Sequence, residues 1–197
     1  EHRGARHVYP CAIVDAAQLR PEGGSVRHVL MEVVAALAEI DQLDFLDDEV
    51  FGGVMPQVEA ARCGERFDYR PVFAALAPRM RAADLTVVNL ETTLTRRGRY
   101  TGYPLFRSPV ALADALRDAG VDVAVLANNH CCDGGAEGIR TTVVELDRCG
   151  ILHTGVFADS ADYKKNNPLY LNRCGMRLAI VNYTYGTNGM PVPAGTI

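Results

Sequence analysis

The stretch VDVAVLANNHCCDGGAEG, residues 121–138, joins a short apolar run to a polar, glycine-rich turn. Residues 121–126 are mostly apolar, include three β-branched valines and are too few for a helix, so they predict a strand buried on both faces. Asn128, Asn129 and His130 follow where this strand ends. In α/β sheets ligands bind at the carboxyl ends of strands, and two amides with an imidazole can serve as ligand groups. The stretch therefore predicts a site in an α/β fold, unless these residues only cap the next helix and satisfy loop backbone groups.

A second segment, LTVVNLE at residues 85–91, has the same design, because an apolar run again ends in polar residues, here Asn89 and Glu91. A carboxylate, an amide and an imidazole together suit a divalent ion such as Mn²⁺, Zn²⁺, Mg²⁺ or Fe²⁺. Glu91 by itself could be a solvated acid at a strand end. Its pairing with Asn129 and His130 in the same strand-then-helix frame favours a metal site.

These two motifs carry a family resemblance. NLE at residues 89–91 and ANNHxxDxG at residues 127–135 stand about forty residues apart, and from about Phe67 to Gly189 the chain resembles the CapA-like, or poly-γ-glutamate capsule synthesis (PGA_cap), proteins. The resemblance implies a calcineurin-like metallophosphoesterase fold. The expected class is α/β (α+β), a four-layer αββα sandwich truncated at its C-terminus.

The resemblance also implies roles for individual residues. Glu91 and Asn129 correspond to metal ligands, and His130 corresponds to the catalytic histidine. Asp133 either orients His130 or caps the following helix, and capping is favoured because an Asp before a helix commonly accepts backbone N–H bonds.

The remaining candidates are supporting residues, expected around the metal ligands or in loops near them. His153 is expected at the end of a strand, where a hydrogen-bonded structural role competes with a supporting role at the site. The residues of this supporting set are Asn89, Asn128, Asp133, His153 and Asn188.

The first motif of the family is altered in this chain. Relatives carry a strand ending in Gly-Asp followed by a His, both of them metal ligands, whereas residues 51–57 read FGGVMPQ with Gly53 at the Asp position and no His. A two-metal site that loses both ligands loses most of one metal's coordination shell. An inactive homologue, a site with one metal and an error in the sequence are the three explanations.

Composition narrows the classes of partner. The chain has 197 residues, 48% hydrophobic and 22% charged, with a formal net charge of −4, which is typical of a globular domain with a core. Mild acidity without a block of Lys and Arg argues against nucleic acid. Six cysteines without a CxxC pair indicate neither a zinc knuckle nor a disulfide framework, although Cys131-Cys132 could hold a soft metal.

Organisation can be outlined from periodicity. Residues 1–45 are an N-terminal segment of unclear status, and residues 46–197 are expected to be an incomplete CapA-like domain. No segment has the long uncharged apolar stretch of a membrane span. The expected elements are helices over 25–40, 71–82, 108–120 and 137–148, strands over 49–55, 85–90, 121–126 and 151–154, and a hairpin over 168–184.

Two functions are compatible with these motifs and with the family resemblance. The first is a metal-dependent hydrolase or transferase that acts in capsule or poly-γ-glutamate formation or export, on an anionic polymer or its precursor. Membrane-bound capsule-synthesis proteins would be its partners, and the resemblance implies a place in the cell envelope or outside the cytoplasm. The second is a non-catalytic binding or scaffolding homologue with a degenerate metal site, which Gly53 favours. Fold analogy cannot decide between them.

Overall fold

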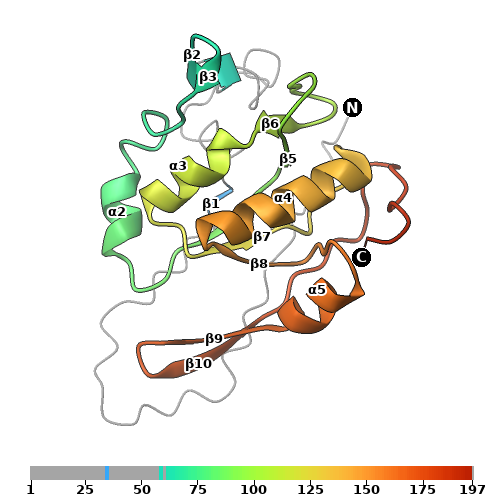
Figure 1. The fold of residues 1–197 in the computed structure, drawn as a ribbon. Coiled ribbons are helices and arrows are strands. Elements are labelled where there is room, and N and C mark those ends of the chain that lie inside the picture. Colours follow the sequence, from blue (N-terminus) through green and yellow to red (C-terminus); the bar gives the residue numbers. More distant parts are fainter. Residues whose placement is uncertain (1–33, 36–57, 60, 197) are drawn as a thin grey trace, which may run out of the picture.

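A four-stranded parallel sheet forms the centre of the molecule (Figure 1). The computed structural model describes residues 34–35, 58–59 and 61–196. The strands lie in the order β1-β4-β7-β8, and all three neighbouring pairs are parallel. Parallel order brings the carboxyl ends of β4 and β7 to the same edge of the sheet. The bounds are β1 Val34–Ala35, β4 Val87–Asn89, β7 Val123–Val125 and β8 Leu152–Thr154.

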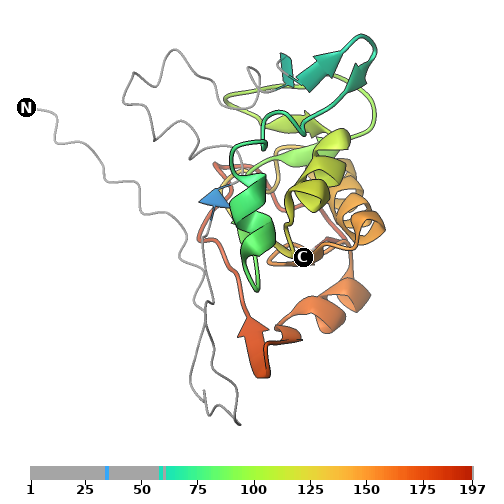
Figure 2. The ribbon, with the colours of Figure 1, turned by 90° about the vertical axis from the view of Figure 1, so that its left-hand side faces the viewer.

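Three helices cover one face of this sheet, and Figure 2 shows them next to one another. They are α2 (Ala77–Ala82), α3 (Ala111–Ala119) and α4 (Gly135–Cys149). Leu112 and Leu116 of α3 are fully buried against Val88 and Ala124 of the sheet. Burial of such leucine side chains contributes roughly 1.5–3 kcal/mol each, so this layer supplies much of the core.

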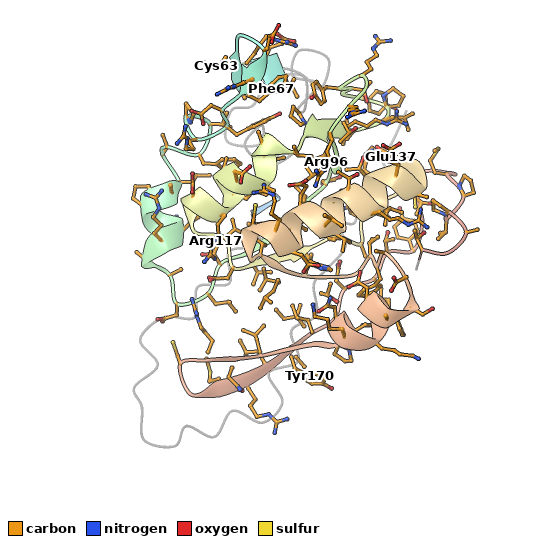
Figure 3. The ribbon with its side chains drawn as sticks, in the orientation of Figure 1. Cys63, Phe67, Arg96, Arg117, Glu137 and Tyr170 are labelled. Carbon is orange, nitrogen blue, oxygen red and sulfur yellow. The ribbon has the colours of Figure 1, made fainter. Side chains whose placement is uncertain are left out.

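A hairpin packs on the opposite face of the sheet. Its strands are β9 (Leu169–Arg173) and β10 (Met176–Ile180), preceded by helix α5 (Ser160–Asn166). Leu169 and Ile180 pack with Val87 and Val123 in a second apolar cluster. The neighbouring side chain of Tyr170, labelled in Figure 3, is 66% exposed. The described residues therefore hold helix, sheet and hairpin layers, three of the four layers expected.

Two smaller strand pairs complete the described fold. β2 (Arg62–Cys63) pairs with β3 (Arg66–Phe67) in antiparallel fashion, whereas β5 (Thr93–Thr95) and β6 (Arg107–Pro109) are parallel. The β5–β6 pair ties the chain after β4 to the chain before α3. Among the described helices, none has the length and apolar character needed to cross a membrane.

The mixed α/β class predicted from the sequence is confirmed, with three local corrections. The helix expected over 108–120 begins only at Ala111, because Arg107–Pro109 form β6. The helix expected over 71–82 spans only Ala77–Ala82, because Pro78 has no N–H to donate to residue 74 and the preceding residues form turns instead. The helix expected over 25–40 is wrong at Val34–Ala35, which pair with β4. A short apolar run is compatible with either a helix or a strand. Backbone pairing with β4 selects the strand here. The strand expected over 49–55 lies outside the described residues.

A buried amide joins the two sheets beside the end of β7. The side chain of Asn182, which follows β10, accepts a hydrogen bond from Ala127 N at 2.5 Å and donates to Ala127 O at 3.3 Å. Gly155, just after β8, leaves room for this amide, because an added Cβ would overlap Asn182 Oδ1 and lie 2.7 Å from Ala127 N. This junction fixes the backbone immediately before Asn128.

Replacement of Gly155 by Ala should destabilise the fold through this overlap. Gly98→Ala is the matched control, since Gly98 has nearly the same positive φ as Gly155 (+101° against +100°) but has nothing within 4 Å of an added Cβ. We expect the free energy of unfolding of G155A, measured in urea, to fall about 2 kcal/mol further than that of G98A. Equal losses in the two variants would show that the junction tolerates a side chain.

Candidate functional site

Asn128 links the carboxyl ends of β4 and β7. Its side chain is fully buried, and its Nδ2 donates to Asn89 Oδ1 at 3.1 Å and to Leu90 O at 3.0 Å. Its Oδ1 accepts the backbone N–H of His130 at 3.0 Å. One amide therefore holds both strand ends and the first turn after β7, which sets the direction of the residues that follow.

His130 and Asp133 form a buried pair in that turn. His130 is 6% exposed and Asp133 is fully buried, and His130 Nδ1 lies 2.7 Å from Asp133 Oδ2. Since a carboxylate only accepts, we assign the proton to Nδ1, which leaves the lone pair on Nε2. Asn188 Nδ2 lies 3.4 Å from that Nε2. The pair thus presents a potential proton acceptor at Nε2.

The expectation that Asp133 caps the following helix is wrong. The N-cap residue of α4 is Gly134, and no side chain forms a cap hydrogen bond there. The carboxylate turns to His130 instead, because only that arrangement gives the buried charge a partner that can share it. Of the two roles considered for Asp133, orientation of His130 is the one that the geometry supports.

Two residues at this site escaped the sequence analysis. The Phe106 ring stacks on the His130 ring with centroids 4.0 Å apart and planes inclined by 22°. The backbone N–H of Phe106 donates to Asp133 Oδ2 at 2.6 Å, and Arg107 Nε and Nη2 donate to Asp133 O at 3.0 and 2.8 Å. No motif links these residues to the turn after β7, since they meet it only through tertiary folding.

Four further candidates, Asn89, Glu91, Asn129 and Asn188, join His130 in one hydrogen-bond network. Asn89 Nδ2 donates to Glu91 Oε2 at 3.4 Å, which connects Glu91 to the strand-end bonds of Asn89. On the other side Asn129 Nδ2 donates to Asn188 Oδ1 at 3.3 Å. The predicted residues at the two strand ends therefore lie together with Asn188, which belongs to the loop after β10.

The side-chain oxygens of Glu91 and Asn129 are of the type that hard divalent cations prefer as ligands. Glu91 contributes a carboxylate, and none of the hydrogen bonds found among the described residues uses Asn129 Oδ1. Within residues 34–35, 58–59 and 61–196, no group of three or more His, Cys, Asp or Glu side chains could hold a metal ion. A site with only two protein oxygens would suit an ion that keeps several waters, such as Mg²⁺, better than zinc with its protein-rich shell.

Two other predicted features lie apart from this network. His153 on β8 is 1% exposed. Its Nε2 lies 3.6 Å from Asp147 Oδ1 and 4.0 Å from Asp162 Oδ1. These two neighbours belong to α4 and α5, not to the cluster around His130. Gly53 of the altered first motif lies outside the described residues.

The adjacent thiols do not favour a soft-metal site. Burial, followed by the neighbouring Cys132, raises the pKa of Cys131 to about 12. Burial also raises the pKa of Cys132. Because the thiolate is the form that ligates metals, a soft metal would have to displace these protons on binding.

Replacement of Asn128 by Asp should destabilise the fold. The carboxylate has the same shape as the amide but cannot donate to Asn89 Oδ1 and Leu90 O, so one half-buried and one buried acceptor lose their partner. We expect a loss of about 2–3 kcal/mol in the free energy of unfolding at neutral pH, measured by urea denaturation. Asn172→Asp, at an exposed position of β9, is the control and should change little. Equal stability of the two variants would contradict the role assigned to Asn128.

Several curated proteins resemble part of this chain. An uncharacterized protein of Sinorhizobium fredii is 35% identical over 95 residues, 45% of this chain and 21% of that protein. A probable polyglutamine synthesis accessory protein of Mycobacterium tuberculosis is 37% identical over 83 residues, 40% of this chain and 21% of that protein. The capsule biosynthesis protein CapA of Bacillus anthracis is 34% identical over 70 residues, 36% of this chain and 16% of that protein. The matched part spans about a fifth of these relatives or less.

The family match is longer than these pairwise matches. The family described as bacterial capsule synthesis protein PGA_cap matches residues 45–195, more than half of the chain. That range includes both strand-end motifs and the loop that carries Asn188. The chain therefore belongs to the PGA_cap family of bacterial capsule synthesis proteins.

Proposed function

We propose that this chain is a metal-dependent hydrolase or transferase of the metallophosphoesterase type that acts in the formation or export of an anionic capsule polymer. The observation that carries the proposal is the buried His130–Asp133 pair, which shares one hydrogen-bond network with the side chains of Glu91 and Asn129. Proton transfer at a histidine beside cation ligands is the chemistry of such hydrolases.

Each residue has a distinct role in this proposal. Glu91 and Asn129 would hold a divalent cation, with Mn²⁺, Zn²⁺, Mg²⁺ and Fe²⁺ as the candidates. A bound cation supplies Lewis acidity toward a phosphoryl or acyl oxygen. His130 exchanges a proton with the reacting oxygen at Nε2, and the carboxylate of Asp133 stabilises the imidazolium that forms.

The proposed substrate class rests on the relatives and on charge. The names of two relatives refer to capsule biosynthesis and to polyglutamine synthesis, so we propose poly-γ-glutamate or its precursor as substrate, with capsule-synthesis proteins of the membrane as partners. The chain has a formal net charge of −4, so a cation at the site would offset repulsion of an anionic polymer.

A second candidate function is a non-catalytic binding or scaffolding role in the same process. Gly53 favours it, because this residue stands where relatives carry an Asp ligand. The buried pair of His130 and Asp133 favours the enzyme instead, since a buried carboxylate and histidine cost stability that a scaffold has no need to retain.

Metal binding separates the two candidates. We expect Mn²⁺ titrated into the purified chain by calorimetry to bind, and both Glu91→Ala and Asn129→Ala to weaken binding at least about tenfold, equal to about 1.4 kcal/mol. Glu65→Ala and Asn172→Ala remove the same two side-chain types at exposed positions and should bind like the parent. Absent binding, or binding that none of the four substitutions changes, would favour the scaffold.

Catalysis is tested at His130. With Mn²⁺ present, we expect turnover of bis-(p-nitrophenyl) phosphate or γ-glutamyl-p-nitroanilide, and a decrease in kcat of about a hundredfold or more in His130→Gln. Metal affinity should stay unchanged, because Gln removes the proton acceptor and not the oxygen ligands. Turnover that H130Q retains would refute an acid–base role for His130, and a parent that turns over neither compound would argue against the enzyme.

A further inference from the structure

The loop from Thr101 to Arg107, called the clamp loop here, is closed on itself. Its two end residues exchange both backbone bonds, with Thr101 N donating to Arg107 O at 3.1 Å and Arg107 N donating to Thr101 O at 2.9 Å. Inside the loop, Leu105 N donates to Gly102 O at 3.1 Å, and the Thr101 hydroxyl donates to Leu105 O. These bonds restrict the loop backbone, and Thr93 of β5 donates to Phe106 O from its N–H at 3.3 Å and from its hydroxyl at 3.0 Å. The loop and β5 together therefore set the position of Phe106.

The clamp loop contacts the buried pair in three independent ways. The Phe106 ring covers the face of the His130 ring, the Phe106 N–H reaches Asp133 Oδ2, and the Arg107 guanidinium binds Asp133 O. The first contact limits the tilt of the imidazole. The Phe106 N–H fixes the side-chain carboxylate of Asp133, and the Arg107 guanidinium fixes its backbone carbonyl.

These contacts matter because Asp133 has few other anchors. Its Oδ1 is buried and has no hydrogen-bond partner among the described residues, so its Oδ2 carries the bonds to both His130 Nδ1 and Phe106 N. A carboxylate that forms hydrogen bonds through only one oxygen can rotate about its Cβ–Cγ bond unless that oxygen also binds a donor that cannot move. The Phe106 N–H supplies the fixed point, and charge-assisted bonds of this kind are the stronger ones.

We propose that the clamp loop is a positioning element that holds His130 in one ring orientation and one tautomer, with the proton on Nδ1 and the lone pair of Nε2 directed into the site. Phe106 and Arg107 are positioning residues, because they act on the reacting group through Asp133 and through ring stacking. The catalytic consequence rests on the function proposed above, whereas the state of the ring does not.

The ring state can be measured without metal or substrate. The ring ¹⁵N signals of the five histidines are recorded at a pH where imidazole is neutral, and His130 is assigned by its loss in H130Q. We expect the parent to show the two well-separated signals of a single Nδ1–H tautomer. In Phe106→Leu and in Arg107→Ala the two signals should move toward each other, because both tautomers become populated.

Two variants serve as controls. Phe106→Tyr keeps an aromatic ring over the imidazole and should retain the parent signals. Tyr103→Leu changes a side chain of the same loop that is 81% exposed and should also leave them unchanged. Arg107 is only partly buried, so R107A tests the proposal even if F106L does not fold.

The outcomes separate this proposal from the proposed function. Parent-like ¹⁵N signals in folded F106L and R107A would overturn the positioning role, whatever the activity of the parent. Shifted signals support it even when the parent has no turnover. If the parent is active, both variants should lower kcat about tenfold or more with KM unchanged, since misplacement of a proton-transfer group affects the chemical step.

Discussion

The parallel pairing of β4 with β7 is the constraint on which the candidate site depends. Val87, Val88 and Asn89 pair in register with Val123, Ala124 and Val125, so the two chains leave the sheet at the same edge. Asn128 then bonds back to Asn89 and Leu90, which keeps the two exits together. A slip in register would move each side chain to the other face of the sheet and separate the two motifs.

The apolar clusters on either side of the sheet stabilise that register. Side chains of β4 and β7 alternate, so that Val88 and Ala124 pack under the helices while Val87 and Val123 pack on the hairpin. Asn182 links the chain after the hairpin to Ala127. The second face of the sheet therefore contributes to the site although it carries none of the predicted ligands.

The buried charge of Asp133 explains why a distant loop matters to the site. Burial of an isolated carboxylate is costly, and the cost falls only when the charge is paired and hydrogen-bonded. His130 supplies the partner and Phe106 supplies a backbone donor. The energetic need of one carboxylate thus couples the segment before β6 to the turn after β7, which makes the geometry of His130 a property of both segments.

Family membership and chemistry rest on different observations in this protein. The PGA_cap match covers residues 45–195 and agrees with the α/β fold, but the relatives match over about a fifth of their length or less. The same fold can host different chemistry. The enzyme and scaffold hypotheses therefore differ at the proposed metal ligands. Gly53 favours the scaffold, whereas Glu91 and Asn129 favour the enzyme.

The sequence by itself determined the α/β class, the order of β4, α3, β7, α4, β8 and the β9–β10 hairpin, and the identity of the strand-end residues, because hydrophobic periodicity and the NLE and ANNH motifs are local signals. It did not predict β5, β6 or α5, and it placed the start of α3 three residues too early. It misplaced the start of α2 and misassigned Val34–Ala35, where local patterns fit two structures. Only the tertiary structure decided that Asp133 turns to His130 and that Phe106 and Arg107 hold this pair. Those contacts join residues 26 or 27 positions apart, and long-range contacts of this kind depend on packing that no local pattern encodes.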